Sequence, residues 1–287
     1  MSLILFIRIF YLPLYNKGKI KIMGKTLEVR MKEYESCYGF KIPARTYTII
    51  RLDGKGFSKY TKMFEKPFDG ILSNVMDVAT VELCKMLNPK FAYTQSDEIS
   101  LIFTDIENIE SEMVYDGKVQ KLCSISASKV TAAFNKTMLR LLATFKYTPQ
   151  ELYNRIVSGD LPELDAVFDS RVFIIPDFRE VSNYFIWRQQ DCTRNSVSMA
   201  ASANFSHKML EGKSSEEKQE MLFQEKNINW NDYLPKYKRG SVIKKQLIFV
   251  EGQDGEPVER RKWLPDYNTP IFTQDKEYLY NLIPIIK

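Results

Sequence analysis

The spacing of apolar residues alternates along the chain between a helical and an extended period, and the order of these segments predicts a fold. Short apolar runs bounded by turn residues predict strands at residues 47–52, on both sides of Ser96-Asp97, and at 171–175. Apolar positions at helical spacing predict helices at residues 27–36, 70–87 and 121–145. From the first strand onward the order is β-α-β-β-α-β, the split βαβ arrangement. We therefore predict an α+β fold, an antiparallel sheet with helices on one face.

The last third of the chain has a different pattern. After Pro176 a long helix is predicted through NYFIWRQQDCTRNSVSMAASANF, and Ser214 with Glu217 three residues later is a capping-box signature for another helix. Two extended segments on either side of residues 252–255 predict a β-hairpin. The turn-rich residues 146–169 are predicted to be an insertion. We expect a catalytic domain at 23–176 and a helical and hairpin region at 177–287.

The composition is that of a globular protein with a sizeable core, since 44% of the 287 residues are hydrophobic and 27% are charged. Lysine and arginine total 41 against 36 acidic residues, a moderate excess that permits RNA binding without requiring it. The cysteines have no CxxC spacing, which argues against a zinc knuckle and a disulfide framework. His207 is the only histidine and is expected at a helix end. Carboxylates are therefore expected to carry any chemistry.

Residues 1–22 are apolar and then basic, with no acidic residue before Glu28. Arg8 and Pro13 interrupt the apolar run, which is too short for a membrane span and has no small-residue cleavage site. Two interpretations stay open: an upstream extension, with Met23 as the functional start, or an organellar targeting segment. We expect a cytoplasmic protein without membrane association, or a mitochondrial one if residues 1–22 are a targeting segment.

Two acidic turns supply the candidate chemistry. Asp53 follows the predicted strand 47–52, and Asp97-Glu98 lie in the middle of the hairpin-like segment FAYTQSDEISLIF. Strand pairing would bring Asp53 and Asp97 side by side. Two carboxylates at a sheet edge hold Mg²⁺ ions roughly 3.5–4 Å apart in enzymes that transfer phosphoryl or nucleotidyl groups. The alternative is that Asp-Gly and Ser-Asp are ordinary turn dipeptides.

The segment after Asp53 favours the metal interpretation. GKGFSKYTKMFEKPFD has two glycines that allow close backbone approach to a ligand. It also has lysines within reach of a polyphosphate: Lys55, Lys59, Lys62 and Lys66. It is not a Walker A loop, because GxxxxGK[ST] is missing.

Two further clusters are typical of contacts with a polyanion. The run WRQQDCTR combines Trp187, a stacking surface, with donors for phosphates or unpaired bases. The run YLPKYKRGSVIKK gathers basic residues between positions 236 and 245 around a glycine. The alternative for each cluster alone is a solvated charged face. Both clusters follow a candidate Mg²⁺ site, which favours a nucleic-acid substrate.

Five motifs in order resemble the tRNA(His) guanylyltransferase superfamily: RLDGKGFSKY, a spacer ending KPFD, AYTQSDEISLIF, FDSRVF and YFIWRQQDCTRNSVSMA. The resemblance extends from about Leu27 to Lys245. It implies a polymerase-like palm domain at 23–176, with residues 177–287 completing a tRNA-binding surface. It also implies nucleotide addition to the 5′ end of RNA in the 3′→5′ direction. The chain is more similar to the guanylyltransferase-like branch, because TRNSVSMA replaces the HINNLYNT of the eukaryotic enzyme.

The resemblance implies a role for each matching residue. Asp53, Asp97 and the carbonyl of Gly54 would bind two Mg²⁺ ions, and Glu98 would assist Asp53 and Asp97 in catalysis. The residues implied for binding the nucleotide and its triphosphate are Lys55, Gly56, Phe57, Ser58, Lys66, Asp69, Ser96 and Lys121. The residues assigned to tRNA are Trp187, Arg188, Gln189, Arg194, Asn195, Lys236, Lys238 and Arg239.

The implied reaction has two steps. ATP adenylylates a 5′-monophosphate end, and the 3′-hydroxyl of an incoming nucleoside triphosphate then displaces AMP. We expect template-dependent repair of 5′-truncated tRNAs, with ATP, GTP and the other nucleoside triphosphates as substrates, by a homotetramer.

Two departures from the family pattern leave alternatives open. Many members have histidine where this chain has Ser58, and Ser170 replaces the glycine of the common FDGRV motif. The alternatives are a dedicated tRNA(His) guanylyltransferase, a nucleotide cyclase that shares the palm and its carboxylates, and a catalytically silent RNA-binding module.

Overall fold

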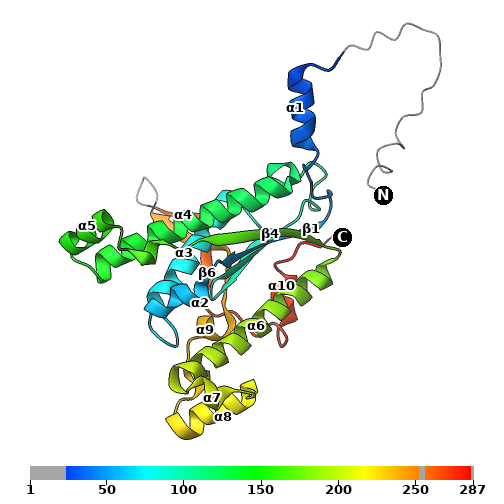
Figure 1. Ribbon diagram of the computed structural model, residues 1–287. Coiled ribbons are helices and arrows are strands. Elements are labelled where there is room, and N and C mark those ends of the chain that lie inside the picture. Colours follow the sequence, from blue (N-terminus) through cyan, green and yellow to red (C-terminus); the bar gives the residue numbers. More distant parts are fainter. Residues whose placement is uncertain (1–23, 252–255, 286–287) are drawn as a thin grey trace, which may run out of the picture. The chain divides into compact units, whose positions relative to one another are not determined.

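The computed structural model describes residues 24–251 and 256–285, so residues 1–22 lie outside the described part (Figure 1). The chain divides into two compact units, one ending at Gly39 and the other comprising Phe40–Lys287. In the first unit the described element is α1 (Leu27–Ser36), which has the bounds predicted from the sequence. The Thr26 hydroxyl caps it by accepting a hydrogen bond from the Val29 N–H.

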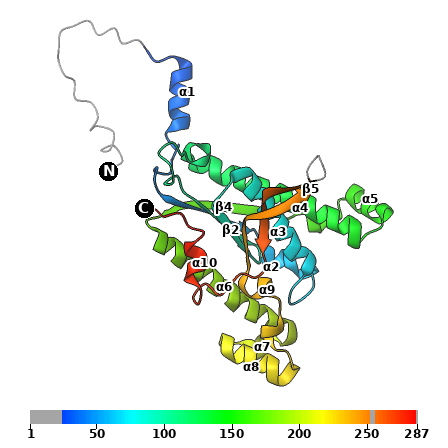
Figure 2. The same ribbon diagram turned by 180° about the vertical axis from the view of Figure 1, so that it is seen from behind.

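The second unit is built on a six-stranded antiparallel sheet of order β4-β1-β3-β2-β5-β6. The strands are β1 (Tyr47–Gly54), β2 (Phe91–Gln95), β3 (Glu98–Phe103), β4 (Phe168–Ile175), β5 (Ser241–Glu251) and β6 (Pro257–Asp266). The first four strands have the order of the predicted split βαβ fold, which is confirmed. The predicted hairpin is β5–β6, and it extends the sheet beyond β2 (Figure 2). Residues 252–255 between these strands lie outside the description.

The helices of this unit are α2 (Phe57–Tyr60), α3 (Gly70–Leu87), α4 (Val119–Phe145), α5 (Pro149–Ser158), α6 (Phe178–Asn204), α7 (His207–Leu210), α8 (Ser215–Lys226), α9 (Pro235–Arg239) and α10 (Lys276–Tyr280). None of the helices in the described ranges has the length and apolar character needed to cross a bilayer. His207 begins α7, at a helix end as expected.

Two layers of helices enclose the sheet. The helices α3 and α4 pack on one face, where Val75, Leu83 and Phe134 join the same apolar core as Leu52. On the other face, Phe185 of α6 packs in a second core with strand residues and with α10 (Figure 1). The predicted one-sided layer therefore corresponds to α3 and α4, and the C-terminal region adds the second layer.

Local signals explain several element boundaries. Asp69 caps α3 by accepting a hydrogen bond from the Leu72 N–H, and Asn88 ends the helix in a left-handed conformation. The predicted capping box at Ser214 and Glu217 is present at the start of α8. A second capping box, at Thr148 and Glu151, begins α5. The segment 146–169, predicted from its turns to be an insertion, therefore contains a helix, because this signal outweighs the surrounding turn residues.

Candidate active site

The two predicted metal carboxylates meet at one end of the sheet. Asp53 is near the end of β1, and its register partner on β3 is Glu98. The turn between β2 and β3 brings Asp97 beside β1, where its carbonyl accepts a hydrogen bond from the Gly54 N–H at 3.1 Å. Ser96, with a φ of 50°, gives this turn its left-handed residue. Strand pairing thus joins two acids that are far apart in the sequence.

The electrostatics of this edge agree with a shared site. The pKa of Asp97 is raised to about 6, mainly by burial and secondly by the neighbouring Asp53 carboxylate. The Asp53 side chain is 40% exposed, and its Oδ2 lies 3.9 Å from Arg171 Nη2. Two like charges held together disfavour the ionised pair, and a divalent cation between them would remove this cost.

The donor set fits a hard cation. No group of three or more His, Cys, Asp and Glu side chains with metal-binding geometry occurs within residues 24–251 and 256–285. The edge instead offers the carboxylates of Asp53 and Asp97 and the carbonyl of Gly54. Such a small set of oxygens matches Mg²⁺, which is commonly bound by one or two carboxylates together with water and substrate phosphates.

The glycines after Asp53 have a steric role. A Cβ at Gly54 would lie 2.2 Å from the Phe57 ring, so a side chain at this position would displace that buried ring. Gly56 has a φ of 70° and precedes α2, a conformation that L-residues adopt only with strain. Lys55 and Ser58 are exposed on either side of this turn. The backbone at the acidic edge is therefore close-packed on one side and open to ligands on the other.

A cavity of about 410 Å³ adjoins the acidic edge. It is lined by residues from four separate stretches of sequence, which include the predicted site residues Phe57, Ser58, Lys66, Asp69, Ser96, Asp97, Asn195 and Lys236. Its wall includes an aromatic pair, Phe68 and Tyr237, whose rings stack with centroids 4.8 Å apart and planes inclined by 4°. The predicted nucleotide residues Lys55, Gly56 and Lys121 are exposed but do not line this cavity. The Lys66 ammonium donates a hydrogen bond to the Thr61 carbonyl at 2.8 Å.

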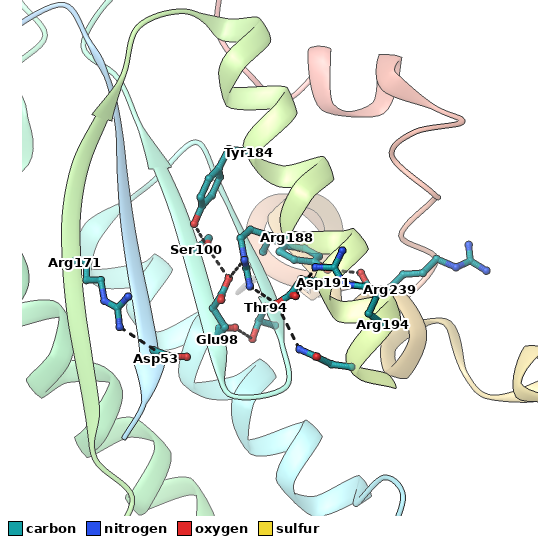
Figure 3. A network of polar contacts seen from close by, with 12 residues as sticks. Asp53, Thr94, Glu98, Ser100, Arg171, Tyr184, Arg188, Asp191, Arg194 and Arg239 are labelled. Atoms are coloured by element: carbon teal, nitrogen blue, oxygen red, sulfur yellow. Dashed lines mark hydrogen bonds and ion pairs between the residues drawn. The ribbon is translucent and has the colours of Figure 1, made fainter. Parts of the chain in front are cut away.

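Glu98 has a different environment from its two acidic neighbours. Its side chain is buried, and its Oε1 accepts a 2.7 Å hydrogen bond from Arg188 Nε (Figure 3). Arg188 Nη2 also donates to Asp191 Oδ2 at 2.7 Å, and Arg194 Nη2 donates to Asp191 Oδ1 at 2.8 Å. Burial raises the pKa of Glu98, and Arg188 opposes that rise. The Glu98 carboxylate therefore belongs to a network that continues from β3 to the surface of α6.

The structure divides the predicted tRNA residues into two groups. Arg188, Gln189 and Lys238 are buried. The Gln189 amide donates to the Pro270 carbonyl at 2.8 Å and accepts from the Phe272 N–H at 2.8 Å, and the Lys238 ammonium donates to the Asn231 carbonyl. In this conformation these three side chains bind the protein itself. The remaining five are exposed or half-buried: Trp187, Arg194, Asn195, Lys236 and Arg239.

The sequence did not predict the surroundings of two residues near the site. Asp77 lines the cavity from α3, within a run predicted as a plain apolar face, and its only signal was an acid among apolar residues. Ser170, which replaces a family glycine, shares a 2.8 Å hydrogen bond with Ser126 of α4. The Ser170 hydroxyl therefore links β4 to α4.

Comparison with known families agrees with this geometry. The family model described as tRNAHis guanylyltransferase matches residues 28–176, and the model of the C-terminal domain of that family matches residues 179–268. The chain belongs to the tRNAHis guanylyltransferase family. The predicted membership is confirmed, as is the class of enzyme, a nucleotidyltransferase.

Relatives resemble the chain over most of its length. The tRNA(His) guanylyltransferase of Schizosaccharomyces pombe is 31% identical over an alignment of 243 positions, which covers 80% of this chain and 84% of the relative. A bacterial guanylyltransferase-like protein solved in complex with ATP has a TM-score of 0.76 and 37% identity, covering 91% of this chain and 100% of that protein. A bacterial guanylyltransferase-like protein in complex with GTP has a TM-score of 0.70 and 34% identity, covering 90% of this chain and 99% of that protein. The palm-like fold of this family is therefore the fold of this chain.

Proposed function

We propose that this protein adds nucleotides to the 5′ end of tRNA in the 3′→5′ direction, using a template base to repair truncated 5′ ends. The observation that carries the proposal is the position of Asp53 and Asp97 beside a cavity of about 410 Å³, a size suited to a nucleotide. The bacterial relatives solved with ATP and with GTP cover about nine-tenths of the chain and support nucleoside triphosphates as ligands.

Two Mg²⁺ ions would be held by Asp53, Asp97 and the Gly54 carbonyl. When bound, such ions would lower the pKa of the attacking hydroxyl and neutralise phosphate charge. The protein's own groups bind and orient the substrates. Lys66 and Ser58 line the cavity beside Asp97, where a triphosphate would lie. Lys55 and Lys121 add positive charge outside the cavity. Fixed cations of this kind stabilise the charge that spreads over phosphoryl oxygens during transfer.

The reaction that fits this arrangement has two displacements. A 5′-phosphate oxygen of the RNA attacks the α-phosphorus of ATP, which forms an adenylylated end and releases pyrophosphate. The 3′-hydroxyl of the incoming nucleoside triphosphate then attacks the RNA 5′-phosphorus, loses its proton and displaces AMP. Each step forms one P–O bond and breaks one.

For the RNA we propose the face formed by Trp187, Arg194, Asn195, Lys236 and Arg239. Asn195 and Lys236 line the cavity, so this face adjoins the nucleotide site. Trp187 is 47% exposed and offers a ring on which an unpaired base can stack. Arg188, Gln189 and Lys238 would support the face by positioning its backbone. The homotetramer, the domain boundary at residue 176 and the cellular location remain predictions.

The proposal is tested by incubating the protein with Mg²⁺, ATP, all four nucleoside triphosphates and a labelled tRNA that lacks its first nucleotide. Intact tRNA(His) is the second substrate, and Asp97→Ala is the control. Extension of the truncated tRNA by the templated base, absent in the variant, is the expected result. Addition of guanosine to tRNA(His) alone would indicate a dedicated guanylyltransferase. No extension of either RNA would contradict the proposal and favour a cyclase or a silent RNA-binding module.

A further inference from the structure

A buried acid in the cavity wall, Asp77, keeps one carboxylate oxygen without a partner in the described part of the chain. Asp77 of α3 is 5% exposed, and its Oδ2 has no hydrogen-bond partner among the described residues. Lys236, a cation whose charge lowers the pKa of Asp77, directs its ammonium to Asn74 Oδ1 at 3.0 Å. No ion pair within the described ranges includes Asp77. Buried acids are normally paired, because desolvation of a carboxylate is costly.

Two kinds of residue line the cavity that has Asp77 in its wall. Asp97 belongs to the acidic edge, where phosphates would be bound through metal ions. Aromatic rings, including the stacked pair Phe68 and Tyr237, form another part of the wall, together with Met76 and Leu72. This apolar and aromatic part is suited to a flat heterocycle. Asp77 is the carboxylate that α3 contributes to this wall, so a bound base would meet a hydrogen-bond acceptor there.

The chemistry of a carboxylate selects among bases. An ionised carboxylate only accepts hydrogen bonds, and its two oxygens accept best from two adjacent N–H donors. Guanine presents such a pair, N1–H and the 2-amino group, on its Watson–Crick edge. Adenine presents the 6-amino donor next to the N1 acceptor, whose lone pair would face a carboxylate oxygen. A carboxylate with an oxygen left to accept therefore discriminates in favour of guanine.

We propose that Asp77 is a specificity-determining residue that accepts hydrogen bonds from the Watson–Crick N–H donors of a guanine base bound in the cavity. The proposal rests on the proposed function, because it assigns the cavity to a nucleoside triphosphate. It concerns the nucleotide bound before RNA, since a guanine whose Watson–Crick donors are held by Asp77 cannot at the same time pair with a template base. Burial raises the pKa of Asp77 to about 6 against the opposing influence of Lys236, Tyr267 and Ser241, so the side chain is mostly ionised at pH 7.5.

The test measures dissociation constants for GTP, ITP and ATP with Mg²⁺ at pH 7.5, in the absence of RNA. In the unmodified protein GTP should bind most tightly, ITP, which lacks the 2-amino donor, more weakly, and ATP more weakly than ITP. In Asp77→Asn the affinity for GTP should fall about tenfold or more, the value expected for losing a hydrogen bond to a charged group. Affinity for ATP should hold or rise, because an amide presents one donor and one acceptor, as adenine does.

The matched control is Glu82→Gln, which changes an acid of the same helix that pairs with Lys85 and Lys129 instead of lining the cavity. It should leave all three constants unchanged. Equal loss of GTP and ATP affinity in Asp77→Asn, or no change in either, would overturn the role of Asp77. ITP binding as tightly as GTP in the unmodified protein would also contradict it, whether or not the variant folds. Failure of the unmodified protein to bind any nucleoside triphosphate would instead overturn the proposed function itself.

Discussion

Two buried acids, Glu98 on β3 and Asp77 on α3, have nearly the same exposure, 6% and 5%, but opposite environments. Glu98 accepts a hydrogen bond from Arg188, which is itself buried, and Arg188 also bonds to Asp191. Asp77 keeps an oxygen without a partner. A paired buried acid is explained by the fold, whereas an unpaired one is a cost to the fold that a ligand can offset. The contrast separates a structural carboxylate from a candidate binding carboxylate.

The largest expected effect is on activity and concerns Asp53 and Asp97. These partly exposed acids are neither paired within the fold like Glu98 nor buried like Asp77. Asp97→Asn should lower nucleotide addition by roughly a thousandfold or more, because losing a metal carboxylate removes several kcal/mol of transition-state stabilisation. The variant should remain folded, since Asp97 lies in a turn and its carbonyl, which accepts from Gly54, is retained. Single-turnover addition to an activated tRNA and urea unfolding measure the two quantities.

The control for that variant is Asp169→Asn. Asp169 is the register partner of Asp53 on β4, and its side chain is 52% exposed and lies 3.5 Å from Arg171 Nε. It has the same chemistry and a neighbouring position, but we assign it no metal. Activity should stay close to that of the unmodified protein. An equal loss in both variants would show that the general negative charge of the edge matters, and not the pair Asp53 and Asp97.

The next largest effect should come from unpairing Glu98. Arg188→Met removes the buried partner and leaves the Glu98 carboxylate uncompensated, which should lower the free energy of unfolding by about 3–5 kcal/mol. Urea denaturation gives this difference, with the m-value as a check for two-state unfolding.

A double variant, Glu98→Gln with Arg188→Met, sharpens the result. It removes both charges, so it should recover most of the lost stability and show a clear coupling energy between the two positions. If the loss of stability in the double variant equals the sum of the losses in the two single variants, the ion pair is not the source of the loss. Arg188 would then contribute through packing on Trp187, whose ring centroid lies 4.2 Å from the guanidinium carbon.

Substitution of Asp77, unlike that of Arg188, is expected to raise the stability of the protein. Its pKa is raised by burial from 3.8 to about 6, so the native state keeps a proton that the unfolded state has lost in this pH window. Stability from this group therefore falls as pH rises from about 4 to about 6, by about 3 kcal/mol in total. Asp77→Asn does not titrate. Without nucleotide, it should be more stable than the unmodified protein by up to about that amount at pH 7.5, and by almost nothing at pH 4.

Paired urea unfolding curves at the two pH values check this prediction, since acids elsewhere in the protein cancel in the difference. A stability difference that is independent of pH would mean that Asp77 has the same pKa in the native and unfolded states, as an acid does when pairing offsets the cost of its burial. That result would also weaken the interpretation of Asp77 as a ligand-binding acceptor. A gain in stability combined with a loss of GTP affinity would instead show that the fold tolerates this acid for the sake of binding.

Local signals made much of the fold predictable. The cap at Asp69, the capping box at Ser214 and the apolar periods of α4 and α6 act within a few residues, so the sequence exposes them directly. The acidic edge was also predictable, because Asp53 and Asp97 each mark a strand end. The missed helix α5 had a local signal as well, the Thr148 and Glu151 box, which lay among turn residues.

Burial of polar residues was not predictable, because it depends on partners distant in sequence. Arg188 follows Trp187 in a run typical of RNA contacts, but its acceptor Glu98 lies 90 positions away and becomes a neighbour only when α6 packs on the sheet. Asp77 has the helical spacing of a core residue, and only the cavity reveals what it faces. In both cases the sequence pattern predicts which side of a helix carries the residue, but the partners that contact that side are set by the tertiary fold.

The smallest effect on stability is expected at the outer end of the Glu98 network. Arg194 pairs with Asp191 like Arg188, but its side chain is 57% exposed. Arg194→Gln should therefore change the free energy of unfolding by less than about 1 kcal/mol. Its effect should appear in tRNA binding, because losing one phosphate contact lowers the slope of log affinity against log salt by about 1. Lys213→Gln, which removes an exposed cation paired with Glu217 near α8, should leave that slope unchanged. Equal slopes for the two variants would mean that Arg194 acts only through net charge. The contrast between the buried Arg188, which supports the fold, and the exposed Arg194, which binds RNA, would then be wrong.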